Sequence, residues 1–124
     1  MAKVFLDANY FIDIVEQRKQ ISWEDFTSHT LYLSPLSVHI LTYLYKYSMP
    51  HHKLKGTLNE YLTFVSADAS LVEHALLGPT ADFEDNVQLH SAAAADCNLF
   101  LTQDKKLLGM KFFGKVEVAA RINI

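Results

Sequence analysis

The stretch VFLDANYFIDIVEQ, residues 4–17, decides the fold class because it joins an apolar run, an acid and a helical pattern. Residues 4–6 are uniformly apolar, which is typical of a buried strand. Asp7 stands where that run ends, and over residues 9–16 the apolar side chains return at helical spacing. The stretch therefore predicts a buried strand, a carboxylate at its end, and a helix.

Further along the chain, helical and strand-like patterns alternate. Proline and glycine separate these patterns, and no linker or internal repeat divides the chain. Helices are expected over residues 23–29, 35–47, 51–61, 70–77 and 82–97, and strands over residues 62–67, 98–102 and 115–118. Because parallel strands need crossovers, which are usually helical, the alternation predicts an α/β fold with a central, mainly parallel β-sheet flanked by helices.

Two of the expected helices carry clear start signals. Ser22 is expected to cap a short helix over residues 23–29. Pro35 suits the first turn of the helix over residues 35–47, where a missing N–H group is harmless. The high apolar content of residues 35–47 predicts a largely buried helix.

The composition of the 124-residue chain suits a single domain over residues 1–124, since 50% of the residues are hydrophobic. The net charge of -3 at pH 7 excludes an overall basic nucleic-acid binder, but not a local basic patch. The single cysteine, Cys97, cannot form an internal disulfide and is expected to be a small buried residue. The chain shows neither a signal-peptide pattern nor an apolar run of about 18 residues. A cytoplasmic protein with no membrane segment is therefore expected.

Two acids follow expected strands at corresponding places. Asp7 comes directly after residues 4–6, and Asp104 follows residues 98–102 by two positions. In open α/β sheets ligands bind beyond the carboxyl ends of the strands, so both acids are expected there. An ionised carboxylate is costly to bury alone, and clustered acids share a cation or shift their pKa values. Because hard oxygen ligands favour Mg²⁺ or Mn²⁺, the sequence predicts a site for one of these ions.

Three segments of the chain also carry a resemblance to a known family. They are VFLDANYFIDIVE at residues 4–16, LYLSPLSVHILTYL at residues 31–44, and DFEDNVQLHSAAAADCNLFLTQDKKL at residues 82–107. In order and spacing they resemble the blocks of a PIN domain, the fold of VapC-type toxin ribonucleases in bacterial toxin–antitoxin pairs. The resemblance implies a three-layer α/β fold and a metal-dependent endoribonuclease, the toxin of a type II pair. It also implies an RNA substrate, a small antitoxin partner and a homodimer.

The resemblance assigns roles to individual residues. It implies Asp7, Asp85 and Asp104 as the catalytic acids and the ligands of Mg²⁺ or Mn²⁺, and it matches Asn9 and Thr102 to the polar helpers of the family. The reaction would be phosphodiester hydrolysis, in which the cation polarises the scissile phosphate and lowers the pKa of a bound water.

Residues beside these acids are expected to support the site. Asp82 and Asp85 have the spacing of a helix capping box, so Asp82 is expected to hold the start of the helix. Lys105 and Lys106 directly follow Asp104 and are candidates for contacts with the RNA backbone; a solvated turn is the alternative for both.

One position departs from the family pattern. PIN nucleases usually place a glutamate six residues after the serine that opens the second block, and counting from Ser34 gives Ile40. The neighbouring His39 is no simple substitute, because adjacent helix positions point about 100° apart. The departure predicts weaker metal binding.

Two other functions stay open at this point. A degenerate, non-catalytic PIN-like module would bind RNA or a protein through the same cleft. A phosphatase of the aspartate-nucleophile kind would use Asp7 covalently, although such enzymes normally carry a second acid where this chain has Asn9. Helix capping alone is also an alternative role for Asp7, and a turn for Asp104.

Overall fold

Six short strands form one sheet in the part of the chain that the structure, a computed structural model, describes, residues 1–122. The strands are β1 (Lys3–Leu6), β2 (Thr30–Leu33), β3 (Leu62–Phe64), β4 (Leu99–Leu101), β5 (Phe112–Phe113) and β6 (Val116–Ala119). Their order is β3-β2-β1-β4-β6-β5, and every neighbouring pair is parallel except β5 and β6. The predicted α/β fold with a mainly parallel sheet is confirmed.

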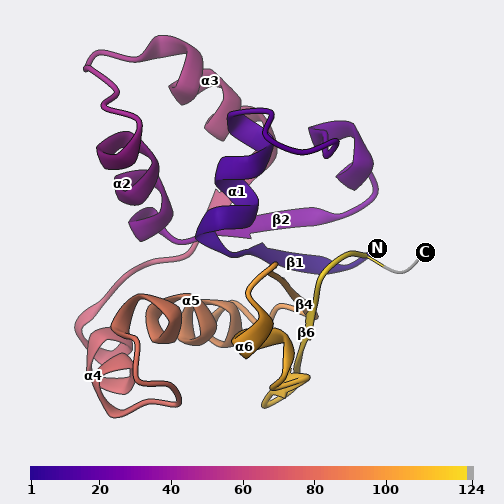
Figure 1. Cartoon of the computed structure of the whole chain (residues 1–124), viewed down its shortest axis with the longest axis vertical. Helices are drawn as coiled ribbons and strands as arrows, with labels where there is room; N and C mark the ends of the chain where they lie inside the picture. Colours follow the sequence, from indigo (N-terminus) through magenta and orange to yellow (C-terminus); the bar gives the residue numbers. More distant parts are fainter. Residues whose placement is uncertain (123–124) are drawn as a thin grey trace.

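Helices cover both faces of this sheet (Figure 1). On one side lie α1 (Ala8–Val15), α2 (Pro35–Leu44) and α3 (His52–Tyr61), and on the other lie α4 (Ala69–Leu77), α5 (Phe83–Ala94) and α6 (Lys105–Leu108). The fold therefore has the three layers expected from the sequence.

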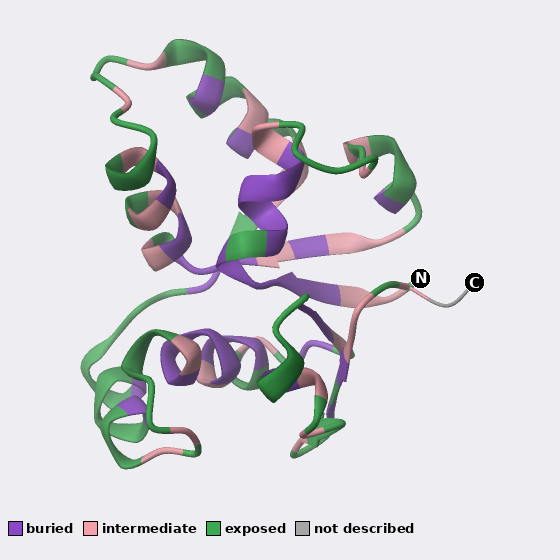
Figure 2. Cartoon of the chain, in the orientation of Figure 1, coloured by how far each residue is buried: buried purple, intermediate pink, exposed green. Residues whose placement is uncertain are grey.

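Each face of the sheet packs against its own apolar core. Side chains along β1 alternate between the faces, so Val4 and Leu6 belong to the core under α1, while Phe5 belongs to the core against α5. In the second core Phe5 stacks on Phe100 of β4, with ring centroids 5.5 Å apart. Figure 2 shows the buried residues concentrated in the central strands, α1 and α5.

The strand order creates a switch point between β1 and β4. The chain moves outward from β1 to β2 and β3, and then returns to the other side of β1 with β4. The Asp7 N–H donates to the Leu101 carbonyl at 2.9 Å, so the carboxyl ends of β1 and β4 lie side by side. Such switch points are where open α/β sheets bind their ligands.

The predicted burial of residues 35–47 is wrong. The helix α2 ends at Leu44, and only Ser37 and Leu41 are buried along it. Tyr43 is 74% exposed. The helix packs one face against α1 and leaves the opposite apolar face uncovered, which the apolar content of the segment could not reveal.

Other boundaries differ in smaller ways. The sequence did not predict β2, β5 or α6, each of only two to four residues. The helix expected over residues 23–29 is a 3₁₀ turn over Trp23–Phe26, and its predicted cap Ser22 is confirmed. Cys97 is buried as predicted, and burial raises the pKa of its thiol to about 11.

Two predictions from the sequence concern the whole chain, and the structure describes residues 1–122 of it. The prediction of a single domain over residues 1–124 extends to residues 123 and 124, which lie outside the described part, and it stays a prediction. None of the helices between residues 1 and 122 combines the length and the apolar character needed to span a bilayer.

Candidate active site

Asp7 lies at the centre of the switch point. It is 6% exposed and is the N-cap of α1, because its Oδ1 accepts the Ala8 N–H at 2.9 Å. Its Oδ2 accepts the Thr102 hydroxyl at 2.8 Å. The carboxylate therefore caps a helix and also belongs to a polar cluster between two strand ends.

Thr102 connects Asp7 to the chain segment that carries Asp104. Its side chain is fully buried, and its backbone N–H donates to the Ala119 carbonyl of β6 at 3.0 Å. The same hydroxyl that donates to Asp7 accepts the Asp104 N–H at 3.0 Å. Thr102 thus fixes the Asp7 carboxylate and the backbone at Asp104. Its supporting role in the site stays a prediction.

Asp104 begins the short helix α6. Its Oδ1 accepts the N–H groups of Lys106 at 2.8 Å and Leu107 at 3.3 Å. The side chain is exposed, as are those of Lys105 and Lys106. The sequence left a turn open as an alternative at this position. The structure has a capped helical turn instead, which carries one carboxylate and two lysines.

The start of α5 brings two further acids. Asp82 is the N-cap, and its Oδ1 accepts the Asp85 N–H at 3.0 Å, which confirms the predicted cap. Asp85 occupies the first turn and is half-buried. Its side chain is free of the capping role, so it is available to the site.

Burial and the charges of neighbouring acids raise the pKa values of Asp7 and Asp85. Burial raises the pKa of the Asp7 carboxyl; hydrogen bonds from Thr102 and Ala8 oppose this shift, and the charges of Asp104 and Asp82 add to it. For Asp85, desolvation by burial raises the pKa to about 6, with contributions from the charges of Asp82, Asp7 and Asp104. Three chain segments thus bring carboxylates within electrostatic reach at one edge of the sheet.

A hollow of about 820 Å³ opens over these acids. Asp82, Asp85 and Asp104 line it together with Lys105 and Lys106, while the buried Asp7 is not part of its wall. The residues around the hollow are Thr80, Ala81, Asp82, Asp85, Asp104, Lys105, Lys106, Leu107 and Met110. The opening is therefore acidic inside, with two lysines beside the acids.

The acids lack a cationic partner within the described residues. Over residues 1–122 the structure has one salt bridge, between Arg18 and Asp13 at 2.6 Å, and it lies outside this site. No three His, Cys, Asp or Glu side chains of this region gather closely enough to form a metal-binding group by themselves. A cation here would need neutral oxygens or water in addition to carboxylates, which is common for Mg²⁺.

Two residues singled out from the sequence are not part of the wall of the acid-lined hollow. Asn9 is exposed on the first turn of α1. Ile40 is half-buried on α2 and packs against the apolar core that contains Val4 and Leu6. Neither side chain is part of the wall of the hollow.

The sequence did not predict a buried polar pair between α5 and α2. Gln88 is 1% exposed, and its Nε2 donates to Oγ of the fully buried Ser37 at 3.1 Å. The sequence does contain one indication of this pair. Gln88 is a polar residue one helical turn after Asp85, in a segment otherwise rich in small and apolar residues.

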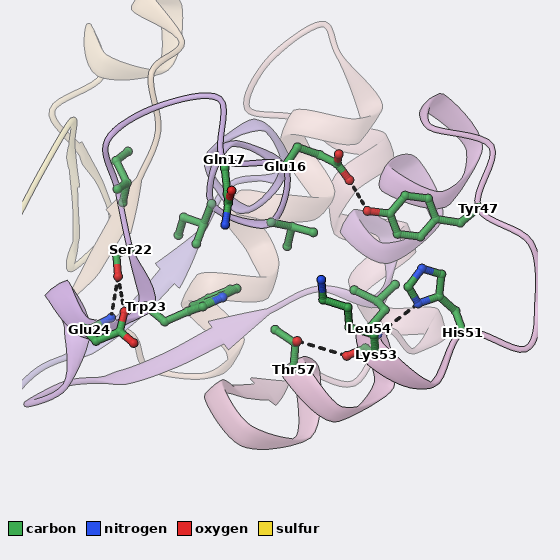
Figure 3. A pocket seen from close by; sticks show the side chains of 13 residues that line it. Glu16, Gln17, Ser22, Trp23, Glu24, Tyr47, His51, Lys53, Leu54 and Thr57 are labelled. Carbon is green, nitrogen blue, oxygen red and sulfur yellow. Dashed lines mark hydrogen bonds between the residues drawn. The ribbon is translucent and has the colours of Figure 1, made fainter.

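A second hollow, of about 560 Å³, lies between the end of α1, the 3₁₀ turn and the start of α3 (Figure 3). Its acids already have partners, since Glu16 accepts the Tyr47 hydroxyl and Glu24 accepts the Ser22 hydroxyl. It contains none of the residues that the sequence singled out as catalytic, so the acid-lined hollow is the candidate active site.

Comparison with known proteins supports the fold. No model of a protein family matches the sequence, and no curated protein matches it. A search of solved structures finds similarity to a chain in the crystal structure of VapBC2 from Rickettsia felis bound to a DNA fragment from their promoter. The TM-score is 0.65 at 12% sequence identity, and the match covers 94% of this chain and 97% of the other. The fold is PIN-like, as the sequence resemblance implied.

The pKa of Asp85 gives a first prediction, on stability. A carboxyl whose pKa in the folded protein is about 6, above its ordinary 3.8, stabilises the fold most below pH 3.8, and this contribution is lost as the pH rises through 6. Asp85→Asn should therefore raise the free energy of unfolding of metal-free protein at pH 7 by about 1 kcal/mol, after allowance for solvent screening.

Urea unfolding in EDTA at pH 4 and pH 7 measures this effect. The advantage of the variant over the wild type should be present at pH 7 and close to zero at pH 4. An advantage of the same size at both pH values would show that the charge of Asp85 does not destabilise the fold.

Proposed function

We propose that this protein is a metal-dependent endoribonuclease of the VapC kind, the toxin component of a type II toxin–antitoxin pair. One observation carries the proposal. Asp7, Asp85 and Asp104 come from three separate elements at the switch point of a PIN-like sheet, where the charge of Asp104 helps to raise the pKa of Asp7 and the charges of Asp7 and Asp104 help to raise the pKa of Asp85. The sequence resemblance to PIN domains names the same three acids.

The residues of the site fit a divalent cation. Their donors are carboxylate oxygens, the hard ligands that Mg²⁺ and Mn²⁺ prefer, and no described basic side chain neutralises them through a salt bridge. Asp7, Asp85 and Asp104 would hold the ion together with neutral oxygens. When bound, the ion would supply charge to polarise the scissile phosphate and to lower the pKa of an attacking water.

The other residues position the reacting groups. The Thr102 hydroxyl holds the Asp7 carboxylate in one orientation, so the acid does not have to reorganise when the substrate binds. Lys105 and Lys106 lie beside the acids, where they would bind backbone phosphates on either side of the cleaved bond. In the reaction the oxygen of a water bonds to phosphorus and the bond from phosphorus to the leaving ribose oxygen breaks. The water releases one proton to solvent, and the leaving oxygen takes one up.

A protein partner is part of the proposal. The uncovered face of α2 and the segment after it expose Tyr43, Leu44 and Met49, and Phe64 of β3 lies exposed nearby. An apolar surface of this kind is typical of a protein interface. The structural relative is the two-component VapBC2, so a small antitoxin is the partner proposed for this chain. The homodimer stays a prediction.

The alternative is a degenerate PIN-like module that binds RNA or protein without cutting, and Ile40 is the observation that favours it. An alkyl side chain stands where the family usually has a glutamate, which leaves the site with one negative charge fewer. The two functions differ in whether RNA is broken, so a cleavage assay separates them.

The test is cleavage of a mixed pool of single-stranded RNA by the purified chain. With Mn²⁺ we expect fragments that EDTA prevents, and Asp104→Asn should remove them because it deletes charge at nearly constant shape. RNA that is bound but intact in Mn²⁺ would favour the non-catalytic module. Cleavage that persists in EDTA would contradict a metal-dependent mechanism.

A further inference from the structure

One buried polar atom has no partner within the described residues. It is Oε1 of Gln88, on a side chain that is 1% exposed. The other end of the same amide is satisfied, because Nε2 donates to Oγ of Ser37 at 3.1 Å. A buried polar group without a hydrogen bond destabilises a fold, so such an atom calls for a ligand or a bound water.

The helix places this amide near the acids. Gln88 follows Asp85 by three positions, and side chains at this spacing lie on the same face of a helix. Helical side chains also lean toward the N-terminus of their helix. This tendency would carry the amide of Gln88 toward the first turn of α5, which includes Asp85.

The partner of Gln88 comes from the other layer of the fold. Ser37 lies in the first turn of α2, just after Ser34, the cap that follows β2. The strands β1 and β2 are parallel with Phe5 opposite Tyr32, and Asp7 and Ser34 each follow these residues by two positions, so α1 and α2 begin at the same end of the sheet. The bond between Gln88 and Ser37 thus joins the two layers at the sheet edge where the acids gather.

We infer that the side-chain oxygen of Gln88 is a neutral ligand, directly or through one water, of the cation proposed for the acid site. This inference rests on the proposed function. An amide oxygen is a hard ligand of the type that Mg²⁺ and Mn²⁺ accept, and it adds no negative charge to the cluster. It supplies a neutral oxygen of the kind that the site needs beside its carboxylates, since no three His, Cys, Asp or Glu side chains of the described residues form a metal-binding group by themselves.

The inference explains how the site could tolerate Ile40. Ser37 and Ile40 are three residues apart on α2 and lie on neighbouring positions of one helix face. The family's glutamate would therefore project from the same face of α2 that contacts Gln88. In this chain the amide of Gln88 on α5 would supply the oxygen ligand that this face of α2 lacks.

Calorimetric titration with Mn²⁺ and thermal unfolding with and without Mn²⁺ test the inference. Gln88→Met removes both amide atoms at similar volume, and we expect it to weaken Mn²⁺ binding about tenfold and to reduce the rise in Tm caused by Mn²⁺. Gln88→Glu should tighten Mn²⁺ binding and lower the Tm in EDTA, because it adds a like charge. Gln20→Met makes the first change at an exposed position and should leave Mn²⁺ binding unaltered.

The outcomes separate this inference from the proposed function. A wild type that binds Mn²⁺ and cleaves RNA, with the same Mn²⁺ affinity in folded Gln88→Met, would overturn the role of Gln88 alone. A drop in Tm of equal size with and without Mn²⁺, at unchanged affinity, would also overturn it and assign Gln88 to packing. A wild type that binds no Mn²⁺ would overturn both. If Gln88→Met does not fold, an unchanged affinity in Gln88→Glu would overturn the inference.

Discussion

Asp7→Asn is expected to reduce RNA cleavage by about 100-fold or more while the protein stays folded. The substitution removes the charge that would hold the cation, and such ions contribute several kcal/mol to the transition state, where each 1.36 kcal/mol is a factor of ten. The asparagine oxygen can still accept the Thr102 hydroxyl or the Ala8 N–H, so the strand ends should remain joined. The measurement is the initial rate of cleavage of the RNA pool in Mn²⁺.

The matched control is Asp96→Asn, at the opposite end of α5. Asp96 is exposed at a φ of 54°, which asparagine adopts readily, and the change removes one charge from the same helix region. We expect this variant to cleave at the rate of the wild type. A rate for Asp7→Asn within a few-fold of the control would exclude Asp7 from the reaction.

Ile40→Glu is expected to have the second large effect. It should destabilise the metal-free protein, but it should tighten Mn²⁺ binding and raise cleavage when metal is present. Without metal, the change puts a like charge on α2, which begins at the acid-bearing end of the sheet, and removes an apolar contact with the core, so the free energy of unfolding should fall by roughly 1–3 kcal/mol. With Mn²⁺, the added ligand should tighten binding about tenfold and raise cleavage.

Mn²⁺ calorimetry and cleavage assays on the wild type and Ile40→Glu side by side check this prediction. Ile40→Gln serves as the control, because it introduces a polar side chain of similar size without the charge. A folded Ile40→Glu that binds Mn²⁺ no better than the wild type would mean that this face of α2 does not reach the site, and that the alignment of the second block with PIN domains is wrong.

Much of the fold could be predicted because local patterns and packing agree. The apolar run before Asp7, the helical spacing after it and the cap at Asp82 each have a direct physical cause, and the structure contains all three. The strand β2 was missed because four residues between a 3₁₀ turn and Ser34 are too few to show a period. The exposure of α2 depends on which neighbour covers it, which its own residues do not encode.

The site could be predicted only in part, for a similar reason. The acids were visible because each stands at an element boundary. The hydrogen bond between Thr102 and Asp7 joins residues 95 positions apart, and the bond between Gln88 and Ser37 joins residues 51 apart. Such contacts follow from strand order and from the packing of one helix against another, so they require the tertiary structure.

The central claim is that Asp7, Asp85 and Asp104 share one divalent cation, and titration calorimetry with Mn²⁺ tests it most directly. We predict saturable binding to the wild type that is weakened at least tenfold in each of Asp7→Asn, Asp85→Asn and Asp104→Asn and is unchanged in Asp96→Asn. Wild-type affinity in all three folded variants, or no Mn²⁺ binding by the wild type, would contradict the claim.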